Sequence, residues 1–393
     1  MNEQFIKPHY DAGGFAGIPN RIRDAFSSGK YDAVVLFLID AFGWRFFERF
    51  QDTVFIQRMA KRGQIEKLTS QFPSTTAAHV TTIHTGLPVG QSGVYEWYYY
   101  EPLVDQIIAP LLFSYAGTKE RDNLRSTKVE PSFLYPRGVF YPELKKMGVA
   151  PYVFGIREYT PSTYSSVVMA GAELRSFKTL SEALVNLGLL LQKQTRPTYV
   201  HLYFDKIDTL CHDYGPDAPQ TEAEIETFLL MMEHYFDRIF RGKKILFLMT
   251  ADHGASEVNP QTTTYLNIGP GFIGFERFLK SNLNGQLLVP AGSARDMFLY
   301  IREDLLDEAQ SFLAPRLEGK ADIVKTDALI AEGYFGSEIS SRFRERVGNL
   351  VILPYRYESV WWYEKDRFEQ RFYGHHGGLT AHEMETILYT YEI

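Results

Sequence analysis

Carboxylate and imidazole side chains recur along this chain at positions from which they could bind a metal ion. Asp40 follows one apolar run, Asp208 and His212 are four residues apart, and Asp252-His253-Gly254 follows another apolar run. His375-His376-Gly377-Gly378 is a further candidate. Each pattern alone is typical of a solvated loop or of a hydrogen-bonded core histidine. Because the first three patterns all follow predicted strands, the set as a whole indicates a metal site.

A threonine-rich stretch at residues 72–86 predicts a helix start that carries a reactive hydroxyl group. Pro73 bars helix before it, Ser74 and Thr75 are good cap residues, and Gly86 is a plausible stop. Thr76 therefore falls near the first helical turn, where free backbone N–H groups and the helix dipole would hold a phosphate on its hydroxyl. Taken alone, the stretch favours an ordinary capped helix with a threonine-rich face.

The elements that must position these side chains alternate between strand and helix. Strands are predicted at residues 33–39, 65–69, 152–155, 197–204 and 244–250, and helices at 44–62, 180–192 and 222–240, with another helix ending near 148. This alternation predicts an α/β fold with a mostly parallel central sheet flanked by helices. Ligands of such sheets bind beyond the carboxyl ends of the strands, which is where the candidate residues stand.

Two regions depart from this alternation. Residues 95–137 are aromatic and poorly periodic, which indicates an excursion over the active-site face. Strands at 297–301 and 321–325, with helices at 305–317 and 327–332, predict a small α+β insert, after which strands at 350–353 and 360–363 are expected to resume the core. We therefore expect residues 1–262 and 349–393 to form the α/β core and residues 263–348 an inserted cap subdomain.

Composition narrows the class of protein. The 393 residues are 45% hydrophobic, enough for a large core, and a net charge of −7 without a long basic run argues against a nucleic-acid surface. The single cysteine, Cys211, excludes an intrachain disulfide, and residues 1–11 lack the apolar core of a signal peptide. Since no apolar run approaches the ~20 residues of a membrane helix, we expect a soluble, cytoplasmic protein, whose oligomeric state the composition does not specify.

In chain order, the motifs resemble those of the alkaline phosphatase superfamily. They are Asp40 after an apolar strand, Phe72-Pro73-x-x-Thr76 with a Thr-Gly downstream, Asp208-x-x-x-His212 followed by Tyr214-Gly215-Pro216, Asp252-His253-Gly254, and His376-Gly377-Gly378. The resemblance is greatest to the type I phosphodiesterase/nucleotide pyrophosphatase branch. It extends from about residue 33 to 392, excluding the insert.

This resemblance implies two divalent metal ions, zinc or alternatively manganese, bridged by the substrate phosphate. One ion would be held by Asp208, His212 and His376, and the other by Asp40, Asp252, His253 and the Thr76 oxygen. Three carboxylate and imidazole ligands suit a zinc ion that keeps one coordination position open. Two such ions could stabilise the attacking and the leaving oxygen of an in-line displacement. Thr76 would attack phosphorus, and water would release the phosphothreonine.

The implied activity is hydrolysis of a small-molecule phosphate ester, with a phosphodiester or nucleotide pyrophosphate bond favoured. The alternatives are a phosphomonoesterase or phosphonate hydrolase of the same superfamily, and a degenerate phosphate-binding protein, against which the intact ligand set argues. A sulfatase would need a Cys-x-Pro-x-Arg setting, and nothing around Thr76 resembles it.

Four further residues are candidates for substrate binding. His79 stands where the branch usually has an asparagine that donates to a phosphate oxygen, and Arg157 could reach a terminal phosphate. Trp97 and Tyr98 could stack on a flat leaving group such as a nucleobase. The competing interpretations are a helix-packing histidine, an exposed arginine, and aromatic side chains that pack a long loop.

Overall fold

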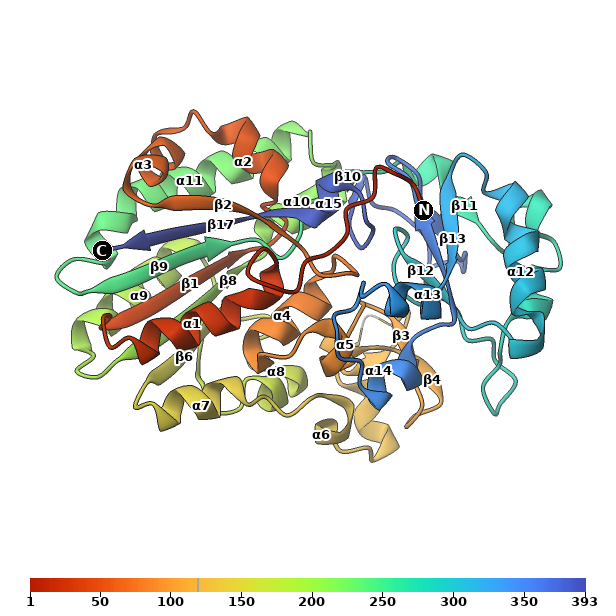
Figure 1. The fold of residues 1–393 in the computed structure, drawn as a ribbon, viewed down its shortest axis with the longest axis horizontal. Coiled ribbons are helices and arrows are strands. Elements are labelled where there is room, and N and C mark those ends of the chain that lie inside the picture. The colour runs from red at the N-terminus through yellow and green to blue at the C-terminus, as the bar shows by residue number, and fades with distance from the viewer. Residues whose placement is uncertain (119) are drawn as a thin grey trace.

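The computed structural model describes residues 1–118 and 120–393, and within these ranges the fold is built on a seven-stranded sheet in the order β2-β17-β9-β1-β8-β6-β7 (Figure 1). The strands are β2 Gln64–Thr69, β17 Glu385–Glu392, β9 Ile245–Thr250, β1 Ala33–Ile39, β8 Thr198–Phe204, β6 Ala150–Ile156 and β7 Glu173–Phe177. β17 pairs antiparallel with both neighbours, whereas the other adjacent pairs are parallel. The predicted α/β class with a mostly parallel central sheet is therefore confirmed.

Helices cover both faces of this sheet because its central strands are apolar on both sides. In β1, Val34, Leu36 and Leu38 join one buried cluster, while Val35 and Phe37 join a second. The first cluster is completed by α1 Ile18–Ser27, α4 Thr76–Thr85, α7 Phe140–Lys146 and α8 Thr163–Val168. The second is completed by α2 Trp44–Phe50, α3 Val54–Arg62, α9 Leu180–Lys193, α10 Lys206–Tyr214 and α11 Pro219–Ile239.

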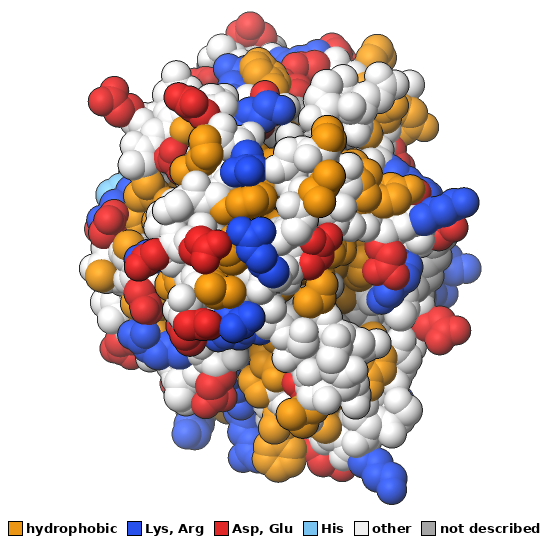
Figure 2. Space-filling model, turned by 90° about the vertical axis from the view of Figure 1, so that its right-hand side faces the viewer, with side chains coloured by type: hydrophobic (Ala, Val, Ile, Leu, Met, Phe, Trp, Pro, Cys, Tyr) orange, Lys and Arg blue, Asp and Glu red, His pale blue; other side chains and the backbone are white. Residues whose placement is uncertain are grey.

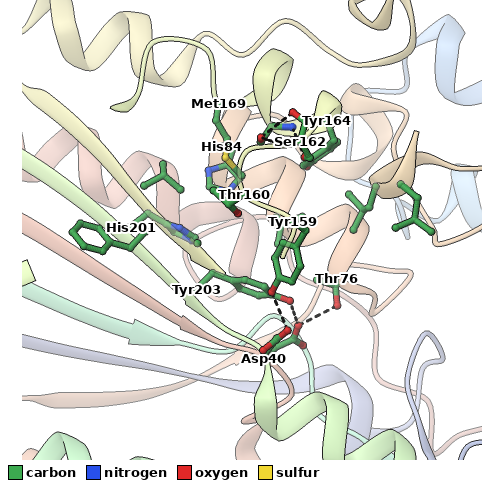
Figure 3. Close-up of a pocket in the computed structure, with 18 of the residues that line it drawn as sticks. Asp40, Thr76, His84, Tyr159, Thr160, Ser162, Tyr164, Met169, His201 and Tyr203 are labelled. Carbon is green, nitrogen blue, oxygen red and sulfur yellow. Dashed lines mark hydrogen bonds between the residues drawn. The ribbon is translucent and has the colours of Figure 1, made fainter. Parts of the chain in front are cut away.

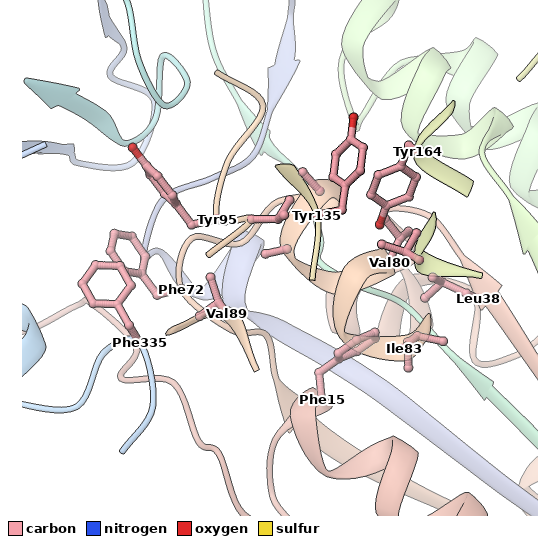
Figure 4. Close-up of a cluster of buried hydrophobic side chains, with 14 of the residues drawn as sticks. Phe15, Leu38, Phe72, Val80, Ile83, Val89, Tyr95, Tyr135, Tyr164 and Phe335 are labelled. Carbon is pink, nitrogen blue, oxygen red and sulfur yellow. The ribbon is translucent and has the colours of Figure 1, made fainter. Parts of the chain in front are cut away.

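The first of these clusters extends from α4 to the loops beyond the sheet (Figure 4). Val80 and Ile83 of α4 pack with Phe15 and Leu38, and further out Phe72 meets Phe335 with ring centroids 5.4 Å apart. α4 is buried along nearly its whole length. The packing therefore fixes the helix whose first residue is Thr76.

The aromatic stretch at 95–137 lies outside the central sheet, as expected. It forms its own antiparallel sheet from β3 Tyr99–Glu101, β4 Gln106–Ala109 and β5 Ser114–Tyr115, followed by the short helix α6 Pro131–Leu134. One residue of the stretch, Lys119, lies outside the described residues.

The region after residue 261 contains a second antiparallel sheet, in the order β12-β14-β13. Its strands are β12 Met297–Leu299, β14 Leu350–Pro354 and β13 Ala321–Lys325, with helices α12 Leu306–Leu313, α13 Thr326–Ala331 and α14 Ser341–Arg346. β14 is the strand expected to resume the core, but it pairs with β12 and β13 instead. Val360 and Trp361 likewise pack in the cap's own hydrophobic cluster. The expected return to the core at Leu350 is thus wrong, because the apolar run completes the cap sheet.

The surface on the cap side carries both signs of charge. Figure 2 shows Lys and Arg side chains interspersed with Asp and Glu over this face, with hydrophobic side chains between them. Within residues 1–118 and 120–393, none of the helices combines the length and the apolar character needed to cross a membrane.

Candidate metal centre

The candidate ligands converge where the parallel strands of the sheet end. Asp40 follows β1, and Asp252 and His253 follow β9, which is its neighbour. Asp208 and His212 lie one turn apart on α10, the helix that begins just after β8. His376 follows the short strand β16 Gly374–His375, which pairs with β10 Ser256–Glu257 just beyond β9. The strand ends thus bring together side chains that are far apart in the sequence.

A first group consists of Asp208, His212 and His376. The Nε2 atom of His212 lies 3.3 Å from Asp208 Oδ2, and Nε2 of His376 lies 3.8 Å from Asp208 Oδ1. One ligand atom from each of the three residues lies within 4.8 Å of the others. Two imidazole nitrogens and a carboxylate at this spacing could hold a divalent cation and leave a position open.

A second group forms around His253. Its Nε2 atom lies 3.4 Å from Asp40 Oδ1, 3.5 Å from Asp252 Oδ2 and 3.1 Å from the hydroxyl oxygen of Thr76. Asp208 is shared, because ligand atoms of Asp40, Asp208 and His253 also lie within 4.8 Å of one another. The rings of His253 and His376 stack with centroids 3.7 Å apart, which brings the two groups side by side.

The three histidines share one hydrogen-bonding arrangement. Their Nδ1 atoms lie 2.8–3.0 Å from backbone carbonyl oxygens, those of Gly374 for His212, Gly254 for His253 and Ser74 for His376. A carbonyl oxygen can only accept, so Nδ1 must carry the proton, and in the neutral ring Nε2 keeps its lone pair. Backbone contacts that fix this tautomer are typical of metal-binding histidines.

The carboxylates of the site lack the partners that buried oxygens normally have. Among the residues that the structure describes, Oδ1 of Asp40, Oδ1 of Asp208 and Oδ2 of Asp252 are buried without a hydrogen-bond partner. Burial raises the pKa of Asp40 well above its usual value, and the neighbouring Asp252 and Asp208 raise it further. Burial also raises the pKa of Asp252. Unpaired carboxylate oxygens beside imidazole lone pairs fit divalent cations, which would supply the missing partners.

Thr76 is the first residue of α4, as the sequence predicted. Gly86 ends the helix with φ +75°, in the left-handed conformation expected of a C-cap glycine. The Thr76 hydroxyl also lies 3.5 Å from Asp40 Oδ2 (Figure 3). The hydroxyl therefore reaches the second group from the helix end whose first backbone N–H groups have no acceptor within the helix.

The loop of His376 is held by a buried network that the sequence did not indicate. Gly377, with φ +121°, leaves no room for a side chain, since a Cβ would lie 2.5 Å from Asp296 Oδ1. Glu383 accepts the Gly378 N–H at 3.0 Å and pairs at both oxygens with the guanidinium of Arg295, at 2.9 and 2.8 Å. This network fixes the segment that carries a candidate ligand.

A cavity of about 230 Å³ opens from Thr76, Asp40 and Asp208 and runs between α4, β6, β8 and α8. Trp97 lines this cavity and also a second hollow beside His376, where Tyr98 is found as well. These two aromatic residues thus lie next to the candidate metal centre. Their role in binding a leaving group stays a prediction.

The other two substrate-binding candidates point elsewhere. His79 is buried, with Nδ1 2.7 Å from Thr75 O and Nε2 accepting from the backbone N–H of Gln71 at 2.8 Å. Both nitrogens are therefore occupied, and His79 acts as a packing residue that does not face phosphate. Arg157 lies 3.5 Å from Glu182 and lines a different hollow, against α9. These two expectations are corrected because packing and ion pairing turn the side chains away.

Tyr203 is a site residue that the sequence analysis missed. It lies on β8 and donates its hydroxyl to Asp40 Oδ2 (Figure 3). A signal was present, because Tyr199, His201 and Tyr203 alternate along one face of an otherwise apolar strand. Polar groups repeated on one face of a central strand indicate that this face approaches a site.

A mostly parallel sheet with an Asp/His cluster at its carboxyl edge defines a hydrolase of the alkaline phosphatase type. The chain belongs to the type I phosphodiesterase/nucleotide pyrophosphatase family, whose model matches residues 34–379. A search of curated proteins found no match.

Solved structures share this fold at low identity. An inactive variant of murine ectonucleotide pyrophosphatase/phosphodiesterase 5 in complex with AMP superposes with a TM-score of 0.67 at 16% identity, covering 91% of this chain and 87% of that one. The human protein of the same name gives 0.66 at 14%, with 91% and 87% coverage. Phosphonoacetate hydrolase from Sinorhizobium meliloti 1021, in complex with phosphonoacetate, gives 0.61 at 14%, with 92% and 90%.

Proposed function

We propose that this protein is a two-metal hydrolase of phosphate esters that cleaves phosphodiester or nucleotide pyrophosphate bonds with Thr76 as its nucleophile. The observation that carries the proposal is the position of the Thr76 hydroxyl, 3.1 Å from His253 Nε2, at the first residue of α4 and at the mouth of a cavity. Such a hydroxyl can meet a phosphate that enters from the cavity.

Two ions fit the residues present. Asp208, His212 and His376 would hold one, and Asp40, Asp252, His253 and the Thr76 oxygen the other. Divalent ions of the zinc or manganese type would supply positive charge that favours ionisation of a hydroxyl and offsets the charge of the phosphate. The shared proximity of Asp208 to both groups supports a single, paired centre.

The protein's own residues then account for the reaction. The Thr76 hydroxyl gives its proton to solvent water, and its oxygen forms a bond to phosphorus as the bond to the leaving oxygen breaks. The leaving oxygen takes up a proton from water, so the number of protons is unchanged. A water molecule next cleaves the phosphothreonine and restores the hydroxyl. The free backbone N–H groups of the first turn of α4 favour an anionic phosphate throughout.

The related structures support this assignment. The murine relative is described as an inactive threonine-to-alanine variant in complex with AMP, which fits a catalytic threonine and a nucleotide ligand. Phosphonate hydrolysis is the second candidate, favoured by the likeness to phosphonoacetate hydrolase. Cytoplasmic location stays a prediction. A separate cap also stays a prediction, with an end later than residue 348, since β14 pairs with β12 and β13.

A substrate panel tests the proposal. Purified protein is supplied with zinc or manganese and assayed on p-nitrophenyl phosphate, its bis ester, p-nitrophenyl thymidine monophosphate and phosphonoacetate. We expect the diesters to be cleaved faster than the monoester. Turnover of phosphonoacetate alone would favour the second candidate, and turnover of none of the compounds would refute the enzyme assignment.

A further inference from the structure

The cavity beside Thr76 is a channel whose walls have a regular geometry. Thr76, Val80 and His84 lie on one face of α4 at four-residue intervals, and all three line the cavity. Eight residues of helix correspond to about 12 Å, which sets the depth from Thr76 to His84. On the opposite wall, Tyr203 and His201 point into the cavity from the same face of β8. Two histidines therefore stand at the inner end (Figure 3).

His201 has no partner at that inner end. It is fully buried in a central strand, and neither of its ring nitrogens has a hydrogen-bond partner among the described residues. A buried polar group without a partner costs about 1–3 kcal/mol, so this position is unfavourable for folding alone. His201 is thus a buried polar side chain that lines a cavity and has no hydrogen-bond partner among the described residues.

His84 completes the polar end of the channel. Its ring meets that of His201 edge to face, with centroids 4.7 Å apart, and its Nδ1 atom is held 2.6 Å from the hydroxyl of Tyr141. The Nε2 atom is therefore the nitrogen that a ligand could use. Burial lowers the pKa of His201 to about 3 and that of His84 well below its usual value, so both rings are neutral. A neutral ring offers one donor and one acceptor.

The charged side chains of the cavity are three carboxylates towards its other end and Arg121, whose guanidinium lies 5.7 Å from the ring centroid of Tyr159. Asp40 and Asp208 belong to the candidate metal centre, and Asp205 accepts a hydrogen bond from Tyr159 just beyond β8. The walls also include apolar side chains, among them Val80 on α4 and Val153, which is the strand partner of His201. Hydroxyl groups of Thr160, Ser162 and Tyr164 belong to residues that line the same cavity. The cavity thus suits a ligand whose anionic end lies at the candidate metal centre and whose other end is uncharged but polar.

We propose that His201 and His84 form a specificity subsite for the organic group of the substrate, recognising an uncharged group that both donates and accepts hydrogen bonds, such as a carboxamide or the edge of a nucleobase. This inference rests on the proposed function for the position of the phosphate. It adds the chemical class of the group that lies farthest from phosphorus.

Binding of two non-hydrolysable phosphonates to the zinc-loaded protein tests the subsite. Benzylphosphonate and 4-carbamoylbenzylphosphonate differ by a carboxamide placed across the ring from phosphorus. Calorimetry should give an affinity about tenfold or more in favour of the carboxamide, the effect of one or two hydrogen bonds. His201→Leu should abolish this preference, and His201→Gln, which keeps a donor and an acceptor, should retain part of it.

Tyr199→Phe is the matched control, because Tyr199 lies on the same face of β8 and its buried hydroxyl also lacks a partner among the described residues. It is not among the cavity's described lining residues, so the preference should persist. Equal affinities in the wild type, or a preference that survives His201→Leu, would overturn the subsite. The subsite would also be overturned if neither phosphonate binds to protein that does bind inorganic phosphate. Loss of turnover in the substrate panel counts separately, against the proposed function.

Discussion

The Nε2 atom of His253 lies 3.1 Å from the hydroxyl oxygen of Thr76, although 177 residues separate the two in the chain. This contact joins the start of α4 to the loop that follows β9. It places the candidate nucleophile at the edge of the carboxylate and imidazole cluster while Thr76 remains half-buried at the cavity mouth. The roles of hydroxyl and ligands can therefore be separated by substitution.

Thr76→Ala should remove turnover and leave the metals bound. The hydroxyl supplies the attacking oxygen but only one of the four proposed ligands of the second ion, and Asp40, Asp252 and His253 are unchanged. We expect activity to fall on the order of 10³-fold or more, with metal content per chain unaltered. Activity and metal analysis on the same preparation measure both effects. Thr76→Ser, which keeps the hydroxyl, is the control, and wild-type activity in Thr76→Ala would rule out the covalent route.

Asp208→Asn should weaken binding at both groups. Its carboxylate lies within reach of His212 and His376 on one side and of Asp40 and His253 on the other. Loss of a direct ligand should lower metal affinity by at least about a hundredfold, since even residues behind the ligands cost 10–100-fold. Equilibrium dialysis measures the metal affinity. Asp213→Asn, an exposed neighbour on α10, should bind metal normally.

Chelation should destabilise the protein, and Asp252→Asn should reduce that effect. Asp40, Asp208 and Asp252 are packed together, and an ion that binds the folded chain raises its stability. Removing one buried carboxylate charge relieves repulsion in the apoprotein while it weakens metal binding. Thermal melts with EDTA should therefore show a higher melting temperature for Asp252→Asn than for the wild type. The order should reverse when zinc is restored, and the same order in both conditions would contradict a metal role.

Acid should destabilise the metal-loaded protein because buried histidines resist protonation. Burial lowers the pKa of His79 and His201 to about 3, from 6.5 in the unfolded chain. The unfolded state then binds more protons below 6.5, so the free energy of unfolding falls as pH decreases from there towards 3. Each residue should contribute about 2 kcal/mol between pH 6.5 and 5. Urea unfolding across this range measures how steeply the free energy of unfolding changes with pH. His201→Leu should reduce this slope by the amount that corresponds to one bound proton.

The sequence was enough to predict which candidate metal ligands lie close together. It was not enough to predict the direction in which each side chain points. Asp40, Asp208 and Asp252 follow apolar strands, and parallel strands bring their carboxyl ends to one edge. His79 is three residues after Thr76, close enough to suggest phosphate contact. Its ring instead turns to the backbone of Gln71, a preference that depends on tertiary packing and not on spacing.

Strand partners were equally hidden. The apolar run of β14 indicates a buried strand, but nothing in the run distinguishes the central sheet from the cap sheet. β17 was not predicted, although Thr386, Ile387 and Tyr389 are β-branched or aromatic residues of the types that favour strands. The residue types of a short run indicate whether the strand is buried. Its strand partners depend on how it packs against residues elsewhere in the chain.

The ion pair between Arg295 and Glu383 ties a loop near the cap to the loop of His376. Both side chains are fully buried, and Arg295 also donates to the carbonyl oxygen of Tyr355 at 2.7 Å. Glu383→Gln leaves a buried guanidinium without its anion, so the free energy of unfolding should fall by about 3–5 kcal/mol. The exposed pair Arg277 and Glu308 is the control, and Glu308→Gln should cost less than about 1 kcal/mol. Because Glu383 accepts the Gly378 N–H, two residues from His376, Glu383→Gln should also weaken metal binding when measured below the melting temperature. If Glu383→Gln is destabilised but binds metal with normal affinity, the ion pair stabilises the fold without supporting the metal centre.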